Sequence, residues 1–499
     1  MKVLLINPKA TQLNRRRKAP SVPLGLLAIA SYIKAKGHTV KIVDLTVKSE
    51  NIEKLIMSFN PEVVGLSFSS TLVGNSTVKI SKIAKRHNKP VVWGGQMASV
   101  LPELCFKEGC VDFIVMGEGE ITFSELLDSI KSGGLFSDID GLAYIDKNGV
   151  HINKDREFAD LKTFPALDWT LVKPNKYCQV YFLCKKMLYL YFSKGCPAKC
   201  TFCYSPGYHR CTHRKRSPEQ VVDEIEYLVK NCGVDGINFA DEFWYPGKED
   251  FKTYIRLIKE RRLEIVWGCQ TRLGVFSKED LQQMYDAGCR WILFGIESGS
   301  EARLKEIKKG INLEKAKDTF RNCREVGITA QSSFIIGYPG ETEDELKETV
   351  SFALSLNANL CPINVLFLQP GSELFEYSVS SGQYTPPKNL KDWSRLQCDE
   401  FDGETLSKIP RKELLVIHFY AQWLGFSQKE SVGSDSYGIV KQLAVQALKN
   451  MFKFNPDNFF LGAYASAKQF ITVVWYAKAY PKILKKYGLG DKNKQQVIS

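Results

Sequence analysis

The first 130 or so residues alternate short apolar runs with segments of helical length. The apolar runs are KVLLIN (2–7), TVKIVD (39–44), EVVGLSF (62–68), PVVWGG (90–95) and DFIVMG (112–117). Apolar runs without polar alternation are typical of parallel strands that are buried on both faces. The pattern therefore predicts an α/β domain over residues 1–135 with a doubly wound parallel sheet.

Ligands of doubly wound sheets bind beyond the carboxyl ends of the strands. In this sequence those ends carry small and polar residues, which leave room for a ligand. We take as candidate binding residues Ser67, Ser69, Gly94, Gly95, Gly117, Glu118 and Gly119.

Residues 136–185 break this alternation. The segment IDGLAYIDKNGVHI (139–152) has two short apolar runs around Asn148-Gly149, which predicts a β-hairpin. Residues 158–177 contain Pro165 and Pro174 and show no regular period, which is typical of a linker. We expect a domain boundary in this region.

A second alternating series follows, over residues 186–400. Its six apolar runs are MLYLYFS (187–193), GINFAD (236–241), EIVWGCQ (264–270), WILFGIE (291–297), TAQSSFIIG (329–337) and PINVLFL (362–368). They predict a six-stranded, partial (β/α) barrel whose active site lies at the carboxyl ends of the strands. Residues 401–499 change to aromatic-rich helical patterns, which predict a C-terminal helical domain.

Composition narrows the class of protein. The 499 residues are 44% hydrophobic and 25% charged, as in folded globular proteins. The 14 cysteines are mostly scattered singly and the first residues lack a secretory pattern, so we expect a cytoplasmic protein. The net charge of +13 is compatible with an anionic substrate, nucleic acid or an acidic membrane surface. No apolar run is long enough to span a bilayer.

The segment GCPAKCTFC places Cys196, Cys200 and Cys203 in the loop after the first strand of the predicted barrel. A cubane iron–sulfur cluster normally takes four thiolates, so three close ligands would leave one iron open for chemistry. The alternative is a zinc site with Cys211, His209 or His213 as the fourth ligand. No second pair of cysteines accompanies the first, as it would in a zinc ribbon.

The cysteine spacing, with Phe202 before the last cysteine, resembles the signature of the radical S-adenosylmethionine (SAM) superfamily. The resemblance implies that the three cysteines hold a [4Fe-4S] cluster as metal ligands. It also implies that the amino and carboxylate groups of SAM chelate the open iron. Reduction then yields a 5′-deoxyadenosyl radical that abstracts hydrogen from the substrate.

Later strand ends resemble the same superfamily and imply contacts with SAM. Asp241 and Glu242 would lie beside its amino group, and Arg272 would pair with its carboxylate. Glu297 and Ser298 would contact the ribose or the sulfonium, and the backbone around Gly337 would approach the adenine. Each residue also has a plain structural reading, as a helix cap, a salt bridge or a turn.

The first domain, placed before such a barrel, resembles the cobalamin-binding domain of cobalamin-dependent radical enzymes. The loops GLSFSS, WGGQMAS and VMGEGE match those that receive the corrin and its nucleotide tail in that family. The first loop contains no histidine to ligate cobalt, and His38 lies beyond the following helix. Either cobalamin binds without a protein imidazole, or the domain is a scaffold that has lost the cofactor.

The resemblance therefore implies a cobalamin-dependent radical enzyme that methylates an unactivated carbon through methylcobalamin and the 5′-deoxyadenosyl radical. Such transfer requires the carboxyl edges of both sheets to face one cavity. The alternative is a non-methylating radical oxidase or cyclase of the anaerobic magnesium-protoporphyrin ester cyclase type. A tRNA methylthiotransferase and a non-catalytic metal-binding scaffold are further readings.

The expected partners follow from the same resemblance. They are a small-molecule or lipid-like substrate and a reductant such as flavodoxin or ferredoxin, without nucleic acid. The lysine-rich C-terminal helices also suggest peripheral contact with the inner face of the membrane.

Overall fold

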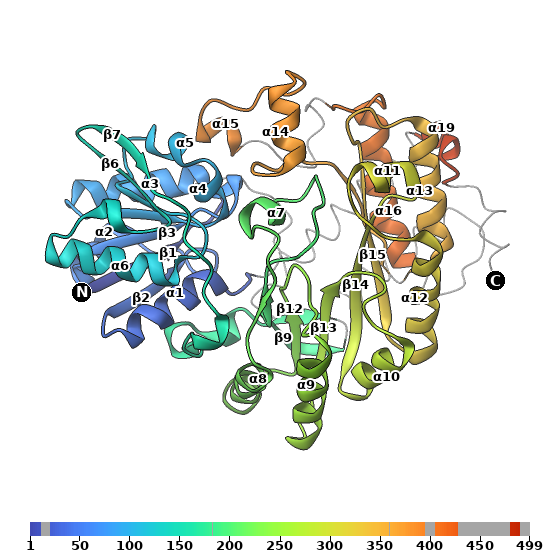
Figure 1. Cartoon of the computed structure of the whole chain (residues 1–499), viewed down its shortest axis with the longest axis horizontal. Helices are drawn as coiled ribbons and strands as arrows, with labels where there is room; N and C mark the ends of the chain where they lie inside the picture. Colours follow the sequence, from blue (N-terminus) through green and yellow to red (C-terminus); the bar gives the residue numbers. More distant parts are fainter. Residues whose placement is uncertain (11–19, 182, 359, 395–404, 428–479, 490–499) are drawn as a thin grey trace.

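The structure is a computed structural model that describes residues 1–10, 20–181, 183–358, 360–394, 405–427 and 480–489. Two seven-stranded sheets, each covered by helices, make up most of the molecule (Figure 1). We call them the N-terminal sheet and the barrel sheet.

The N-terminal sheet has the strand order β2-β1-β3-β4-β5-β6-β7. Its strands are β1 (Lys2–Asn7), β2 (Thr39–Asp44), β3 (Val63–Ser67), β4 (Val91–Gly94), β5 (Phe113–Val115), β6 (Leu142–Asp146) and β7 (Gly149–Ile152). Strands β1 to β5 are parallel, as predicted from their apolar runs. The predicted hairpin forms β6 and β7, which extend the sheet in the antiparallel direction beyond β5.

Helices cover both faces of this sheet, which makes it doubly wound. On one face, α1 (Leu24–Ala35) packs against α6 (Gly119–Ser132), and both contribute to one buried core. The core on the other face includes residues of α2 (Ile52–Phe59), α3 (Gly74–Arg86), α4 (Gln96–Val100) and α5 (Pro102–Phe106). A short 3-10 helix, η1 (Thr71–Val73), precedes α3.

The barrel sheet has the order β16-β15-β14-β13-β12-β9-β8. Its strands are β8 (Gln179–Tyr181), β9 (Cys184–Leu190), β12 (Gly236–Phe239), β13 (Val266–Thr271), β14 (Cys289–Glu297), β15 (Thr329–Ile336) and β16 (Ile363–Val365). The six predicted strands, β9 and β12 to β16, are parallel. The antiparallel β8 was not predicted and lies at one edge. Because β8 and β16 do not pair, the barrel is open, as expected.

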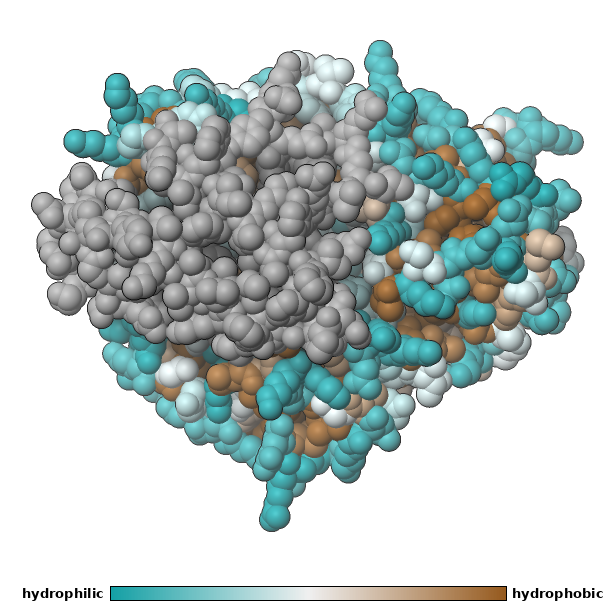
Figure 2. Space-filling view, turned by 180° about the vertical axis from the view of Figure 1, so that it is seen from behind, coloured by the Kyte–Doolittle hydropathy of each residue, from teal (hydrophilic) through white to brown (hydrophobic). Residues whose placement is uncertain are grey.

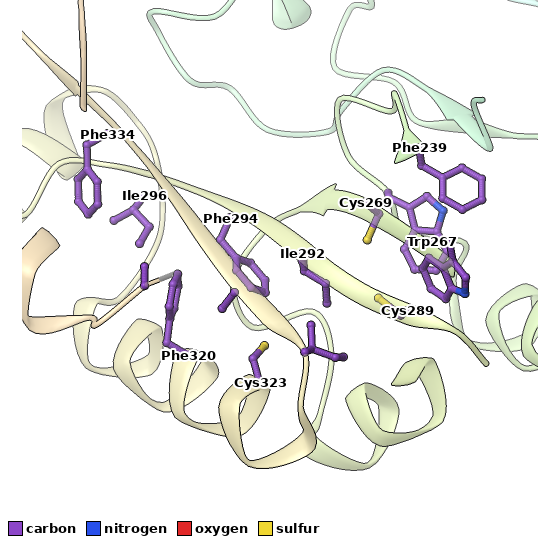
Figure 3. Packing of buried hydrophobic residues seen from close by; sticks show 14 of the residues in the cluster. Phe239, Trp267, Cys269, Cys289, Ile292, Phe294, Ile296, Phe320, Cys323 and Phe334 are labelled. Atoms are coloured by element: carbon purple, nitrogen blue, oxygen red, sulfur yellow. The ribbon is translucent and has the colours of Figure 1, made fainter. Parts of the chain in front are cut away.

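Helices between the strands cover the barrel sheet. They are α8 (Pro218–Cys232), α9 (Lys248–Glu260), α10 (Lys278–Asp286), α11 (Glu301–Glu306), α12 (Leu313–Val326) and α13 (Glu343–Ser355). Three of these helices, α8, α10 and α13, begin with a capping box, which satisfies backbone amides at their first turn. Figure 3 shows part of the core, where the rings of Phe294 on β14 and Phe320 on α12 lie 5.5 Å apart.

The segment between the two sheets contains three short 3-10 turns, η3 (Leu161–Thr163), η4 (Trp169–Leu171) and η5 (Pro174–Lys176), whereas the 3-10 turn η2 (Phe136–Asp138) lies earlier, between α6 and β6. It is anchored to the barrel where the Trp169 indole donates to Glu224 Oε1 at 2.6 Å. Glu224 is also paired with Arg216 at 2.5 Å. These buried contacts fix the linker against α8.

The segment after the barrel returns to the first domain. It contains α14 (Glu373–Ser380) and α15 (Leu390–Trp393), which lie at the top of Figure 1 between the two sheets. Leu390 is 1% exposed and belongs to the core formed with α3 and β3. Asn75 of α3 donates to the Ser394 hydroxyl at 2.7 Å.

The expected C-terminal helices are described in part. Helix α16 (Arg411–Ser427) packs beside β16, and α19 (Pro481–Lys486) packs on α16. The remainder of that expectation, residues 428–479, lies outside the described residues. Seen from behind, hydrophilic and hydrophobic residues are mixed over the coloured surface (Figure 2). Within the described ranges, no helix has the length and apolar character needed to cross a bilayer.

Candidate active site

The three candidate metal ligands lie in one closed loop. Strands β10 (Ser193–Lys194) and β11 (Arg214–Lys215) pair in the antiparallel direction and join the ends of residues 195–213, which we call the cysteine loop. Gly195 has a φ of +84°, and a Cβ there would lie 2.4 Å from the Thr212 carbonyl oxygen. The loop therefore closes only with glycine at this position. It also contains the short helix α7 (Ser205–Tyr208).

The cysteine thiols are shielded from solvent to different degrees. Cys200 is 6% exposed, and Cys196 and Cys203 are half-buried. Burial raises the pKa of Cys196 and raises that of Cys203 to about 11, and the neighbouring cysteines add to the effect at Cys203. The Ser205 amide opposes the rise by donating to Cys203 Sγ at 3.4 Å. Three neighbouring thiols that affect one another's pKa fit a cluster whose iron would stabilise their thiolate forms.

In the described part of the chain, no three His, Cys, Asp or Glu side chains are placed to hold a single metal ion, and this applies to the three cysteines as well. A zinc ion gathers its ligands on one point, whereas a cubane cluster binds each cysteine through a different iron. His213, proposed as a fourth zinc ligand, instead contacts the Phe243 carbonyl oxygen at 3.0 Å.

Glu242 and Asp241, at the end of β12, have different surroundings. Glu242 faces the cysteine loop: it accepts hydrogen bonds from the Gly195 amide at 3.1 Å and the Tyr204 hydroxyl at 2.9 Å. Asp241 is 3% exposed and accepts from the Phe192 amide at 3.0 Å and the Ser193 hydroxyl at 2.5 Å. Asp241 thus holds the start of the cysteine loop, and Glu242 is the better placed of the two to meet a ligand.

Arg272, at the end of β13, reaches the cysteine loop from the other side. Its Nη1 lies 3.8 Å from Cys200 Sγ, and its Nη2 donates to the Lys309 carbonyl oxygen. The guanidinium is therefore held beside the cysteine that is most buried. This position is compatible with the expected pairing to a ligand carboxylate at an open iron.

Glu297, at the end of β14, has the left-handed φ of +75°. Its carboxylate accepts from Lys309 Nζ at 2.8 Å, and both side chains are buried. Sequence reasoning missed Lys309, which belongs to no recognised motif and follows α11. The Lys309 ammonium also lies close enough to Cys196 and Cys203 to lower the pKa of both against the effect of burial.

The remaining candidate residues of the barrel make contacts within the protein that support its fold. The Ser298 hydroxyl contacts the Thr349 hydroxyl at 3.1 Å and accepts from the Ser300 amide. Gly337 has a φ of +88°, and its amide donates to Glu341. Phe202 packs edge-on against Tyr338 with ring centroids 6.2 Å apart. Buried oxygens without a hydrogen-bond partner lie at nearby strand ends, on Thr271, Tyr338 and Glu341.

Comparisons with known proteins identify both domains. Residues 190–353 match the Radical SAM superfamily, and residues 13–127 match the B12 binding domain. An uncharacterized methyltransferase of Pyrococcus horikoshii is 30% identical over 432 residues, which cover 84% of this chain and 92% of that protein. The chain belongs to the B12-binding radical SAM family.

Two further similar proteins carry the names of different reactions, a cyclisation and a methyl transfer. The anaerobic magnesium-protoporphyrin IX monomethyl ester cyclase of Rubrivivax gelatinosus is 27% identical, over 75% of this chain and 70% of that protein. The radical SAM methyltransferase TsrM of Kitasatospora setae, solved with cobalamin and a [4Fe-4S] cluster, superposes with a TM-score of 0.64. It is 21% identical, and the match covers 76% of this chain and 78% of TsrM, which shows a shared fold.

In this radical SAM protein, the candidate loops of the B12-binding domain lie together. Ser67 pairs with Gly94 at the ends of β3 and β4. Gly95 has a φ of +101°, and a Cβ there would lie 3.1 Å from the Phe68 backbone. The neighbouring Gln96 has a buried Nε2 without a partner. A tight turn beside an orphaned amide donor fits a polar ligand such as the corrin periphery.

Gly117 and Gly119, on either side of Glu118, are required for different structural reasons. Gly117 has a φ of +71°, and its amide donates to the Ser99 hydroxyl at 3.0 Å. At Gly119, a Cβ would lie 2.8 Å from the side chain of Ile29, so this glycine allows α6 to approach α1. The exposed Ser69 lies in the loop after β3. These contacts explain the conformation of the loop around Glu118. Its contact with cobalamin stays a prediction.

The B12-binding domain meets the two ends of the cysteine loop through part-buried ion pairs. Lys194 Nζ donates to Glu120 Oε1 at 2.7 Å, and Arg214 donates to both carboxylate oxygens of Glu118. The Tyr208 hydroxyl of α7 donates to the Gly117 carbonyl oxygen at 2.7 Å. A cavity of about 290 Å³ lies at this junction, lined by residues from both sides that include Ser99, Gly117, Glu118, Phe158, Tyr208 and Arg210.

Proposed function

We propose that this protein is a cobalamin-dependent radical SAM methyltransferase that methylates an unactivated carbon of a small-molecule substrate. When bound, the cluster and SAM supply hydrogen abstraction, and cobalamin supplies the methyl group. Cys196, Cys200 and Cys203 would hold the cluster. The loops that contain Ser67 and Ser69, Gly94 and Gly95, and Gly117 to Gly119 would hold cobalamin.

The observation that carries the proposal is the meeting of the two carboxyl edges. Glu118, in the loop after β5, and Glu120, in the first turn of α6, contact Arg214 and Lys194 at the two ends of the cysteine loop. Methyl transfer requires the reactive groups of both domains to share one cavity, and sheets that faced apart would exclude it. The relative named a methyltransferase is also matched over more of its length than the cyclase relative, 92% against 70%.

Different side chains of the barrel would bind different groups of SAM. Glu242 would accept the amino group of SAM, and Arg272 and Lys309 would place positive charge beside its carboxylate. Glu297 would face the ribose or the sulfonium. The electron would come from a reductant such as flavodoxin or ferredoxin. The described residues add nothing to the expected membrane contact.

The test uses anaerobically purified, iron-reconstituted protein with hydroxocobalamin, SAM and a strong reductant. Wild-type protein should bind the corrin and release 5′-deoxyadenosine, and S-adenosylhomocysteine should accompany it if methyl transfer occurs. Oxidation or cyclisation would yield 5′-deoxyadenosine alone. Cys200→Ala should lose the cluster iron and both products. Cys211→Ala, in the same loop but outside the triad, should keep them; equal loss in both variants would contradict the assignment.

A further inference from the structure

His209 lies between carboxylates from the two domains. Its Nε2 lies 3.4 Å from Glu242 Oε1 at the end of β12, and its Nδ1 lies 3.9 Å from Glu118 Oε1 in the loop after β5. The ring is 5% exposed, and Nδ1 is buried without a hydrogen-bond partner. One imidazole therefore spans the gap between the proposed SAM-binding carboxylate and the proposed corrin-binding loop.

The two carboxylates beside this ring are both held in their anionic form. Burial raises the pKa of Glu242, but hydrogen bonds from His209 and Tyr204 outweigh it and lower that pKa to about 2. The pKa of Glu118 is also lowered, because Arg214, Lys194 and His209 outweigh its burial.

The other contacts of the two carboxylates extend the link in both directions. Glu242 also accepts from Gly195 and Tyr204, which adjoin the first and last cysteines of the triad. Glu118 is clamped by Arg214 and lies next to Gly117, whose carbonyl accepts from Tyr208. A shift of either loop would therefore change the distance from a carboxylate to the His209 ring.

We propose that His209 is a positioning residue that couples SAM binding at Glu242 to corrin binding at residues 117–120. The inference rests on the proposed function, which assigns those two ligands to these two loops. Each ligand fixes its own loop, and the buried His209 ring, packed between the two carboxylates, transmits that order from one carboxylate to the other. Binding of the corrin should thus tighten binding of SAM, and by linkage the reverse holds by the same factor.

The measurement is a pair of SAM dissociation constants for cluster-reconstituted, oxidised protein, by equilibrium dialysis with radiolabelled SAM. Without reductant SAM is not cleaved, so binding is read apart from turnover. One constant is taken without corrin and one with saturating hydroxocobalamin. Wild-type protein should bind SAM at least about 5-fold more tightly with corrin present, the lower end of typical couplings between sites.

His209→Gln keeps a polar side chain but removes the ring that lies between the two carboxylates, and the ratio should fall to about 1. His213→Gln is the matched control, because His213 lies in the same loop but its Nε2 contacts the Phe243 carbonyl oxygen, at 3.0 Å, and not a carboxylate. It should keep the wild-type ratio. A merely structural role for His209 would weaken SAM binding equally with and without corrin, which leaves the ratio unchanged.

Glu118→Gln tests the same link from the other domain and should also abolish the coupling, so the inference does not depend on one variant folding. A wild-type ratio retained in His209→Gln would overturn the inference. So would a wild-type ratio of 1 with both ligands bound, which leaves the proposed function intact. Wild-type protein that binds no corrin would overturn the proposed function itself.

Discussion

Replacing Lys194 with methionine should destabilise the junction between the two sheets. Lys194 Nζ lies 2.7 Å from Glu120 Oε1 and 3.9 Å from Glu118 Oε2. The side chains of Lys194 and Glu120 are 19% and 4% exposed, so little water replaces the lost cation. Removal of one partner from a buried ion pair costs about 3–5 kcal/mol. Because Arg214 still neutralises Glu118, we expect the lower end, about 3 kcal/mol.

A double-mutant cycle with Glu120→Gln isolates the pair. Removing both charges leaves neutral side chains of similar length, so the double variant should be more stable than the sum of the single changes predicts, by about 1–3 kcal/mol. Urea unfolding followed by tryptophan fluorescence gives the free energies. The exposed pair Lys317–Glu314 provides the control, and Lys317→Met should change stability by less than about 0.5 kcal/mol.

The result that would refute this reasoning is specific. If Lys194→Met unfolds within about 0.5 kcal/mol of wild-type protein, Lys194 is not a buried partner of Glu120 in solution. The contact between the two carboxyl edges, on which the proposed function depends, would then lose its main support. A large effect without coupling to Glu120→Gln would place Lys194 in a different set of contacts.

Three other changes test separate parts of the structure. Leu390→Ala should cost about 2–5 kcal/mol, because Leu390 is 1% exposed in the core of the N-terminal domain, whereas Leu135→Ala at a 71% exposed position should cost little. Arg272→Lys should weaken SAM binding about 10-fold in dialysis and leave cluster iron unchanged, because lysine lacks the planar fork. The depressed pKa of Glu242, about 2, stabilises the fold above pH 4.5, and this contribution is lost as the pH falls toward 2. With its side chain 28% exposed, we expect Glu242→Gln to remove about 2 kcal/mol of that pH dependence in cluster-free protein.

The strands were predictable because their burial pattern is simple. Residues Val3 to Ile6 of β1 are all buried, as are most residues of β14, so both strands read as continuous apolar runs. The β6–β7 hairpin was predictable from its turn residues. Its antiparallel pairing with β5 was not, because nothing local in residues 139–152 specifies which edge of the sheet they join.

The candidate site was predictable as a set of positions but not as a set of partners. Every candidate from Cys196 to Gly337 lies at or near a carboxyl strand end, as the repeating pattern indicated. Asp241, however, is saturated by the start of the cysteine loop, and Glu118 pairs with Arg214, 96 residues away. Lys309 carries no motif at all. Such partners depend on how elements distant in sequence pack, which periodicity does not encode.

The charges at the junction also explain how the two sheets find one relative orientation. Lys194 and Arg214 are paired residues of the β10–β11 ribbon, so the ribbon presents two cations side by side. Glu118, in the loop after β5, and Glu120, in the first turn of α6, lie two residues apart and meet Arg214 and Lys194 respectively. A docking of the two sheets that separated these partners would leave the buried Glu120 and three part-buried charges unpaired, at a cost of about 3–5 kcal/mol for a buried partner. The arrangement that neutralises them is the one that brings the B12-binding domain against the two ends of the cysteine loop, and two of the four residues that specify it, Glu118 and Glu120, also line the cavity at this junction.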